Sequence, residues 1–196
     1  MTMLLALLAT ALIPGSSVST PAPPILGESQ FGYTYVELNY LLTDSDAADD
    51  TLGGLELVGS LELPLHFFGQ LGISRQSDNA DLDQFRLGVG YYLPVAEQFD
   101  VYGLLSYARF EVDDSGADFD DDGTAAEIGA RTLISPKFEL NGAGKWTNLD
   151  DDEVGLGLGA RYYMTEALSL GGRLETIDDE DTIAVGVRYQ LGTRRD

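Results

Sequence analysis

The chain has 196 residues, a length that suits one domain, and it has no cysteine, which excludes a disulfide framework and a thiolate metal site. Eleven Lys and Arg against 33 Asp and Glu give a formal net charge of −22, so the clustered cations that nucleic-acid binding needs are missing. Any electrostatic partner should therefore be a cation.

The first residues are typical of an export leader. A mostly apolar run from Leu4 to Ile13 is too short to span a bilayer as a helix, but it suits the hydrophobic region of a secretory signal peptide. No Lys or Arg precedes Arg75, so either the true start lies upstream of Met1 or the export signal is atypical; a loosely packed tail is the alternative. We predict a signal peptide and Pro-rich linker in residues 1–27 and one barrel domain in residues 28–196.

After the leader, ten segments place large apolar side chains on every second residue, which is the period of a β-strand. They cover residues 31–42, 53–63, 67–76, 82–93, 99–112, 124–134, 137–148, 153–163, 167–176 and 182–192. Helical periodicity is lacking from this part of the sequence. The pattern predicts an all-β fold, a closed antiparallel up-and-down barrel of about ten strands.

The predicted connections alternate in kind. Four are tight, at 64–66, 94–98, 135–136 and 164–166, and three of these contain proline, which readily forms turns. The other five begin at Thr43, Ser77, Asp113, Leu149 and Ile177, and together they hold 20 Asp and Glu without any Lys or Arg. Nearly all of the net charge should therefore project from one end, with both chain termini at the other.

The two faces of the predicted strands differ in character. In the last segment, Ile183, Val185 and Val187 share one face, while Gly186 and Arg188 share the other. Over the whole chain the second face carries glycines, six acids and six bases: Glu37, Glu56, Glu62, Glu127, Glu139 and Glu175 with Arg86, Arg131, Lys145, Arg161, Arg173 and Arg188. Because buried charges must be paired, we predict an interior ion-pair network inside a transmembrane β-barrel. In a soluble barrel the apolar face would point inward instead.

Aromatic residues lie near the ends of the apolar face, as in the two interfacial girdles of a membrane barrel. One predicted girdle, near the tight turns, contains Phe67, Tyr91, Phe99, Phe138, Tyr162 and Tyr189; the other, near the acidic connections, contains Tyr40, Phe85, Tyr107 and Trp146. Phe99 and Tyr107 are separated by a length of strand that spans about 20 Å along a tilted barrel, close to the apolar band of about 25 Å.

With the strands placed, the chain resembles the small outer-membrane β-barrel proteins of Gram-negative bacteria, the OmpA-like and OmpX-like group in the broad sense. The resemblance is carried by the YTYVE stretch (Tyr33 to Glu37), the DQFRLGVGYYL stretch (Asp83 to Leu93) and the Asp-rich connections, and it covers residues 30–192. It implies an outer-membrane location, acidic loops outside, termini in the periplasm, and contact with lipid and lipopolysaccharide. It carries over no catalytic residue, so we expect no enzyme, and we expect a monomer.

One acidic connection contains a possible metal site. DFDDDG (Asp118 to Gly123) matches the opening of a calcium loop, with Asp118, Asp120 and Asp122 as the candidate ligands, but its twelfth position is Gly129 instead of Glu. A solvated acidic loop that attracts Ca²⁺ or Mg²⁺ diffusely is the favoured alternative, and we expect no other cofactor. The only histidine, His66, lies in a tight turn and is interpreted as a polar turn residue.

Three functions remain open from the sequence. The leading hypothesis is a non-enzymatic outer-membrane barrel that anchors acidic loops and has a structural or surface-interaction role. The lumen charges could instead line a narrow channel for small solutes, although ten strands leave an interior largely filled by side chains. An exported soluble barrel that carries a ligand is the third possibility.

Overall fold

The computed structural model describes residues 29–45, 51–77, 81–114, 117–148, 152–178 and 180–192. The predicted signal peptide and linker fall outside these residues. Ten strands form one sheet: β1 (Tyr35–Ser45), β2 (Thr51–Glu62), β3 (Phe67–Ser77), β4 (Asp81–Ala96), β5 (Phe99–Asp114), β6 (Ala117–Ser135), β7 (Phe138–Asn148), β8 (Asp152–Tyr163), β9 (Leu168–Ile177) and β10 (Glu180–Gln190).

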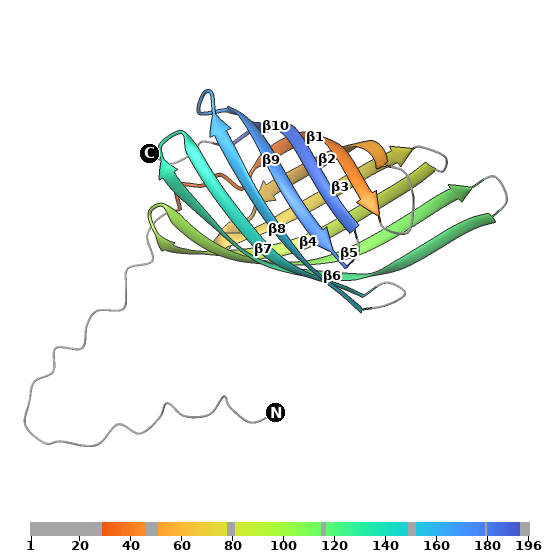
Figure 1. Ribbon diagram of the computed structural model, residues 1–196. Helices are drawn as coiled ribbons and strands as arrows, with labels where there is room; N and C mark the ends of the chain where they lie inside the picture. Colours follow the sequence, from red (N-terminus) through yellow and green to blue (C-terminus); the bar gives the residue numbers. More distant parts are fainter. Residues whose placement is uncertain are drawn as a thin grey trace, which may run out of the picture.

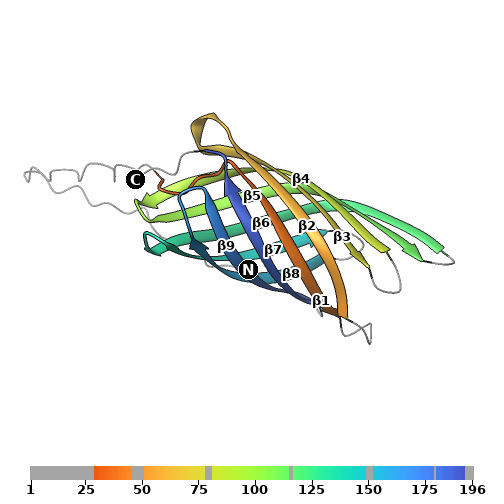
Figure 2. The ribbon, with the colours of Figure 1, turned by 90° about the horizontal axis from the view of Figure 1, so that it is seen from above.

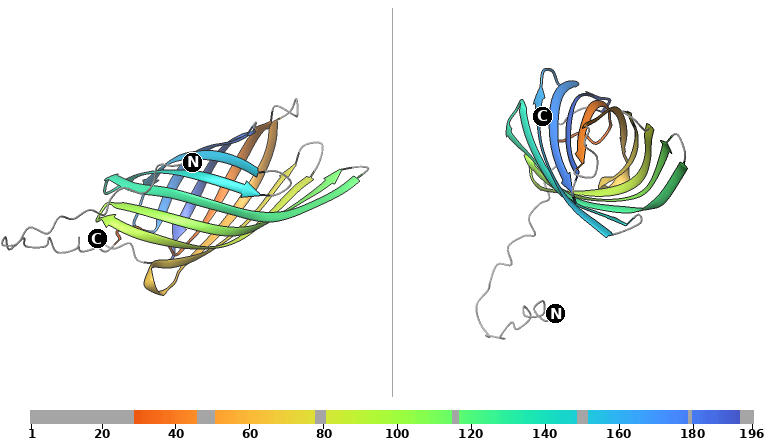
Figure 3. Two further views of the ribbon diagram at one scale, coloured as in Figure 1. Left: turned by 90° about the horizontal axis from the view of Figure 1, so that it is seen from below. Right: turned by 45° about the vertical axis from the view of Figure 1, so that its right-hand side comes forward.

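The sheet closes into a barrel. Each strand pairs antiparallel with its neighbours in sequence, and β1 pairs with β10 from Tyr35 opposite Gln190 to Ser45 opposite Glu180. Figure 1 and Figure 2 show the tilted strands from two sides, and the right-hand view of Figure 3 shows the strands curving round into a ring. The predicted fold class and strand number are thus confirmed.

The barrel has two unlike ends. The end with the short connections (63–66, 97–98, 136–137 and 164–167) also holds residues 29–34 and 191–192, and we call it the turn end. The end at which β1 joins β2, β3 joins β4, β5 joins β6, β7 joins β8 and β9 joins β10 is called the hairpin end. The strands β5 and β6 extend furthest at this end in Figure 1 (green).

The apolar face points outward. Leu156 on β8 is 69% exposed, whereas Arg161 on the same strand is 6% exposed and faces the lumen. The exposed large side chains include Val187 and Trp146. This arrangement is the reverse of a soluble barrel, which hides its apolar face. None of the described segments forms a helix of the length and apolarity that crossing a membrane requires.

Three boundaries differ from the predicted ones. Residues 31–34 are not part of β1, which begins at Tyr35. The strand β6 begins at Ala117 and not at residue 124, because the ladder with β5 continues from Tyr107 opposite Thr124 out to Asp114 opposite Ala117. The connection predicted at 94–98 shrinks to 97–98, since β4 continues through Pro94 with a register shift between Pro94 and Ala96, a bulge that accommodates a residue without an N–H.

Candidate functional site

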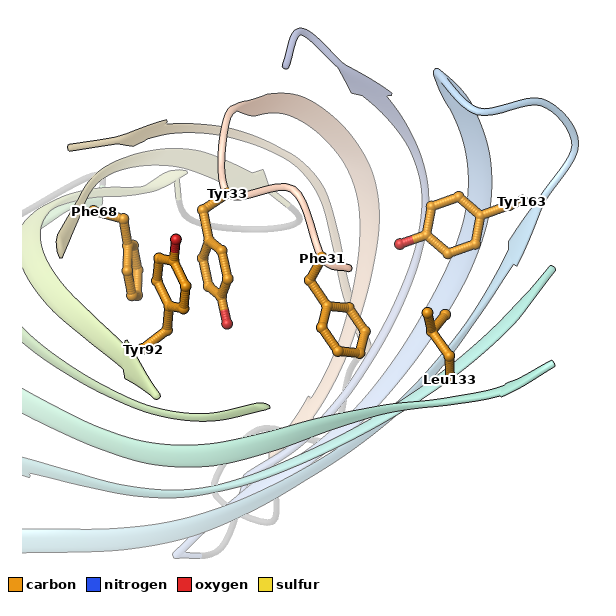
Figure 4. Close-up of a cluster of buried hydrophobic side chains, with 6 residues drawn as sticks. All are labelled: Phe31, Tyr33, Phe68, Tyr92, Leu133 and Tyr163. Atoms are coloured by element: carbon orange, nitrogen blue, oxygen red, sulfur yellow. The ribbon is translucent and has the colours of Figure 1, made fainter. Parts of the chain in front are cut away.

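Residues 29–34 fold into the lumen at the turn end, and we call them the plug. Phe31 and Tyr33 are buried there against Phe68, Tyr92 and Leu133, with Tyr163 in the same cluster. Figure 4 shows both plug side chains pointing into the barrel from the chain that leads into β1. The Tyr33 and Tyr92 rings are stacked, with centroids 4.0 Å apart. An apolar plug therefore fills this end of the lumen.

Two lumen residues hold the plug by polar contacts. Asp100 on β5 is completely buried; its carboxylate accepts hydrogen bonds from the Ser29 hydroxyl at 2.5 Å and the Tyr33 hydroxyl at 3.1 Å. The Arg131 guanidinium lies over the rings of Phe31 and Tyr33, at 4.6 and 5.0 Å from their centroids. Cation–π contacts of this kind are strongest where water is excluded. The plug is thus bonded as well as packed.

Beside the plug, Arg131 forms a bidentate pair with Glu139. Its Nε and Nη2 atoms donate to the two carboxylate oxygens at 3.0 and 3.1 Å. The Tyr163 hydroxyl donates to the same carboxylate at 2.5 Å. One layer further in, Glu37 accepts from Arg161 at 2.9 Å and from Arg188 at 2.6 Å, so one carboxylate joins β1, β8 and β10.

Nearer the hairpin end, the charges form a chain. Glu56 accepts from Arg86 at 2.7 Å and from Arg173 at 3.3 Å, and it also accepts from the Asn39 amide at 2.8 Å. The Glu175 carboxylate forms ion pairs with Lys145 Nζ at 2.6 Å and with Arg173 Nε at 3.2 Å. Through Arg173 and Glu175 on β9, these contacts link Glu56 on β2 to Lys145 on β7, the strand opposite β2 in the ring. The lumen is therefore crossed by side-chain bridges and not only lined by them.

The other two predicted members of the network make weaker or different contacts. Glu127 lies 3.7 Å from Lys145 and accepts a hydrogen bond from the Tyr102 hydroxyl at 2.6 Å. Glu62 accepts from the Tyr92 hydroxyl at 2.6 Å, near the plug. The structure thus brings eleven of the twelve predicted residues into ion pairs and places Glu62 in a hydrogen bond with a tyrosine.

A small space remains among these side chains. It has a volume of about 140 Å³ and is bordered by Tyr33, Glu37, Glu56 and Arg173, with small residues such as Gly157 on one wall. Arg86 and Arg173 are about one third exposed, at 32% and 33%, so the lumen is wetter toward the hairpin end.

The predicted girdle residues lie on the outward face of their strands. At the turn end these are Phe67, Tyr91, Phe99, Phe138, Tyr162 and Tyr189, and at the hairpin end Tyr40, Phe85, Tyr107 and Trp146. The strand β5 pairs with β6 without a register shift. Arg109 points outward and pairs with Glu111 at 2.7 Å, while its neighbour Ala108 is buried in the lumen.

The predicted calcium loop is not a loop. Its backbone is part of β6 and pairs with β5, with Glu111 opposite Asp120 and Arg109 opposite Asp122. The side chains of Asp118 and Asp120 lie outside the described ones, and that of Asp122 is exposed. Within the described part of the chain, no group of three or more His, Asp or Glu is arranged to hold a metal ion. His66 ends a 3-10 turn (Pro64–His66), and its ring centroid lies 4.9 Å from that of Tyr92.

The sequence reasoning missed the plug and its anchor, Asp100. The strand period could have placed Asp100 in the lumen, because it lies two residues before Tyr102, which faces the lumen. Nothing comparable marked Ser29, which precedes the first predicted strand, while the strand period wrongly assigned Phe31 to that strand.

A closed barrel with an apolar outer face, aromatic side chains near both rims and ion pairs inside is a transmembrane β-barrel, because a closed sheet satisfies its backbone hydrogen bonds without water. The chain belongs to the outer membrane protein β-barrel domain family, whose model matches residues 8–191. This family and the fold confirm the resemblance to Gram-negative outer-membrane barrels and the outer-membrane location.

Solved structures that match this chain are distant from it in sequence. The structure titled NanC porin matches with a TM-score of 0.53 at 11% identity and covers 80% of this chain and 100% of that one. The KdgM porin gives a TM-score of 0.48 at 10% identity over 80% of this chain and 99% of its own. The translocator domain of the autotransporter NalP from Neisseria meningitidis matches with a TM-score of 0.49 at 13% identity and covers 85% of this chain and 91% of its own. At 11% identity, the likeness to the NanC porin shows the fold alone. A search of curated proteins found no match.

Proposed function

We propose that this protein is a non-enzymatic outer-membrane barrel with a sealed lumen, which anchors acidic hairpins at the cell surface for a structural or surface-interaction role. The observation that carries the sealed lumen is the plug. Tyr33 and Phe31 close the turn end with apolar contacts, and the ion pairs of Glu37 and Glu56 cross the space behind them. A solute that crosses the lumen would have to displace both the plug and these ion pairs.

Planar bilayer recording of the full-length protein tests the seal. We expect no stable conductance steps. A narrow channel is the second candidate, supported by the cavity of about 140 Å³ and by the porin title of the structure with the TM-score of 0.53. Stable cation-selective steps that widen in Arg86→Ala or Arg131→Ala would overturn the sealed lumen and establish the channel.

The proposed orientation places the hairpin end outside the cell and the turn end in the periplasm. It rests on the general rule that short turns face the periplasm and longer loops face outward. Because the chain has no cysteine, a single introduced one is unique. A membrane-impermeant maleimide should label Asp152→Cys on intact cells and leave Lys137→Cys unlabelled until the cells are opened. The opposite pattern would reverse the orientation.

The acidic hairpins should attract divalent cations diffusely. Asp122, Asp152 and Asp181 are exposed at the hairpin end. The five connections that the sequence predicts for this end hold 20 of the 33 acidic residues. Calcium should therefore raise the melting temperature of the wild type and of a variant with Asp118, Asp120 and Asp122 changed to Asn by nearly equal amounts. A calcium effect lost from the variant alone would show a specific site. No calcium effect on either protein would refute the cation attraction.

A further inference from the structure

A groove on the lipid-facing surface lies near the hairpin end of β1 to β5. It has a volume of about 430 Å³. Its apolar part is formed by Leu38, Leu55, Leu57 and Ile73, all of which are 42% or more exposed on the outer face. Phe85, a residue of the predicted outer girdle, also borders it. In a membrane such a surface meets lipid chains.

The same groove is bordered by two arginines, Arg75 on β3 and Arg109 on β5. Six of the eleven Lys and Arg of the sequence point into the lumen, Lys137 lies in a turn at the opposite end, and Arg194 and Arg195 fall outside the described residues. Among the described residues, Arg75 and Arg109 are thus the two cations on the outer face near the hairpins. Both arginines border the same groove, although the chain as a whole is strongly acidic.

The register of β3, β4 and β5 brings Arg75 and Arg109 to the same groove. Across β3, β4 and β5, Ile73, Phe85 and Arg109 form one outward row, and Arg75, Asp83 and Glu111 form the next row toward the hairpins. Arg75 lies 3.6 Å from Asp83, and Arg109 lies 2.7 Å from Glu111. The arginine side chains are 64% and 48% exposed, so both guanidinium groups also face the surroundings.

Elsewhere around this rim the described outward charges are carboxylates. Asp44, Asp122, Asp152 and Asp181 are exposed on other strands at the same end. An anionic head group is repelled by these side chains, whereas at the groove two guanidinium groups offset the two neighbouring acids. Arginine also matches phosphate oxygens with paired N–H donors. Within the described part of this rim, the groove is therefore the one favourable position for a phosphate.

We propose that this groove binds the phosphorylated lipid anchor of lipopolysaccharide, with a phosphate on Arg75 and Arg109 and an acyl chain over Leu55, Leu57 and Ile73. The choice of lipid rests on the proposed orientation, in which the hairpin end faces the outer leaflet. The site lies on the outer wall of the barrel, so it is independent of whether the lumen conducts.

Native mass spectrometry of the detergent-solubilised full chain tests the proposal with bisphosphorylated lipid A as the probe. We expect lipid A to bind, the same lipid without phosphates to bind about tenfold less, and an Arg75→Gln/Arg109→Gln double variant to bind lipid A about tenfold less, since a hydrogen bond to a charged group is worth at least that factor. Lys137→Gln, which removes one exposed cation at the other end, should bind as the wild type does.

Three results would overturn the site. They are a double variant that binds lipid A normally, a Lys137→Gln variant that loses as much as the double variant, and equal binding of the dephosphorylated lipid. Heat-modifiable gel migration shows that each variant is folded. Phosphatidylglycerol that displaces lipid A at equal concentration would overturn the assigned lipid and point to the other leaflet. A dimer peak lost only from the double variant would assign the groove to a second copy of the chain.

Discussion

Neutralising Glu139 should destabilise the barrel more than any surface charge change. The side chains of Arg131 and Glu139 are only 7% and 1% exposed, and two hydrogen bonds at 3.0 and 3.1 Å join them. Glu139→Gln keeps the shape but leaves the buried Arg131 charge without the carboxylate that accepts its two hydrogen bonds, which costs about 3–5 kcal/mol. Replacing both residues, with Arg131→Met added, removes the uncompensated charge and should recover part of that loss.

Equilibrium unfolding by urea in lipid vesicles measures this cost. Trp146 is the only tryptophan of the chain and lies on the outer face, so its fluorescence reports the move from lipid to water. Glu111→Gln is the matched control: its partner Arg109 is as close, at 2.7 Å, but the two side chains are about half exposed, and the change should cost about 1 kcal/mol or less. Equal losses for Glu139→Gln and Glu111→Gln would refute the role of burial.

Three further predictions concern the outer face, the plug and the packing of the lumen. Leu158→Arg on the outer face should cost about 2–4 kcal/mol in the same unfolding assay if the residue lies near the bilayer midplane, and an unchanged stability would contradict the membrane-facing assignment. Tyr33→Ala should speed hydrogen exchange at residues 29–34 by about a hundredfold, a local cost of about 3 kcal/mol, while the strand amides stay protected; uniform exchange would show that the plug is not a separate unit. A Cβ at Gly129 would overlap the ring of Tyr102, so Gly129→Ala should cost about 1–3 kcal/mol, whereas at Gly144 a Cβ meets no atom within 4 Å and Gly144→Ala should be neutral or stabilising by about 0.4–1 kcal/mol. Equal effects of the two glycine changes would contradict the crowding of the lumen.

The strand period predicted most of this architecture because each residue of a barrel strand has only two places to point. Leu156 and Arg161 could be assigned to opposite faces from their positions alone, and the structure places them so. The pairing of charges followed from the cost of burying them singly, but the individual partners did not. Arg161 and Glu37 are separated by 124 residues, and only ring closure brings them to 2.9 Å.

The plug was beyond reach of the same reasoning. Phe31, Tyr33 and Tyr35 continue the alternation of β1, so the period extended the strand into residues that leave the sheet. What turns them inward is tertiary: the Asp100 carboxylate accepts from Ser29 and Tyr33, and Arg131 lies over both rings. No local pattern encodes a contact between residues 29 and 100.

The prediction of a loop between β5 and β6 was wrong for a different reason. Runs of Asp are rare in strands, so composition favoured a loop from Asp113 onward. The ladder with β5 nevertheless continues from Arg109 opposite Asp122 to Asp114 opposite Ala117. Backbone pairing with the adjacent strand overrides a weak propensity.

The plug also sets the strength of the ion pairs behind it. Exposure of the lumen arginines rises from 7% at Arg131, beside the plug, to 33% at Arg173, toward the hairpin end. Water near a charge pair weakens both its attraction and the penalty for breaking it. Removing the Tyr33 ring should therefore admit water to Arg131 and lower the cost of Glu139→Gln. In a double-mutant cycle, Tyr33→Ala and Glu139→Gln together should cost less than the sum of the single changes, by an amount in the range of about 0.5–3 kcal/mol seen for residues in contact. Strict additivity would mean that the plug packs beside the ion pairs without excluding water from them.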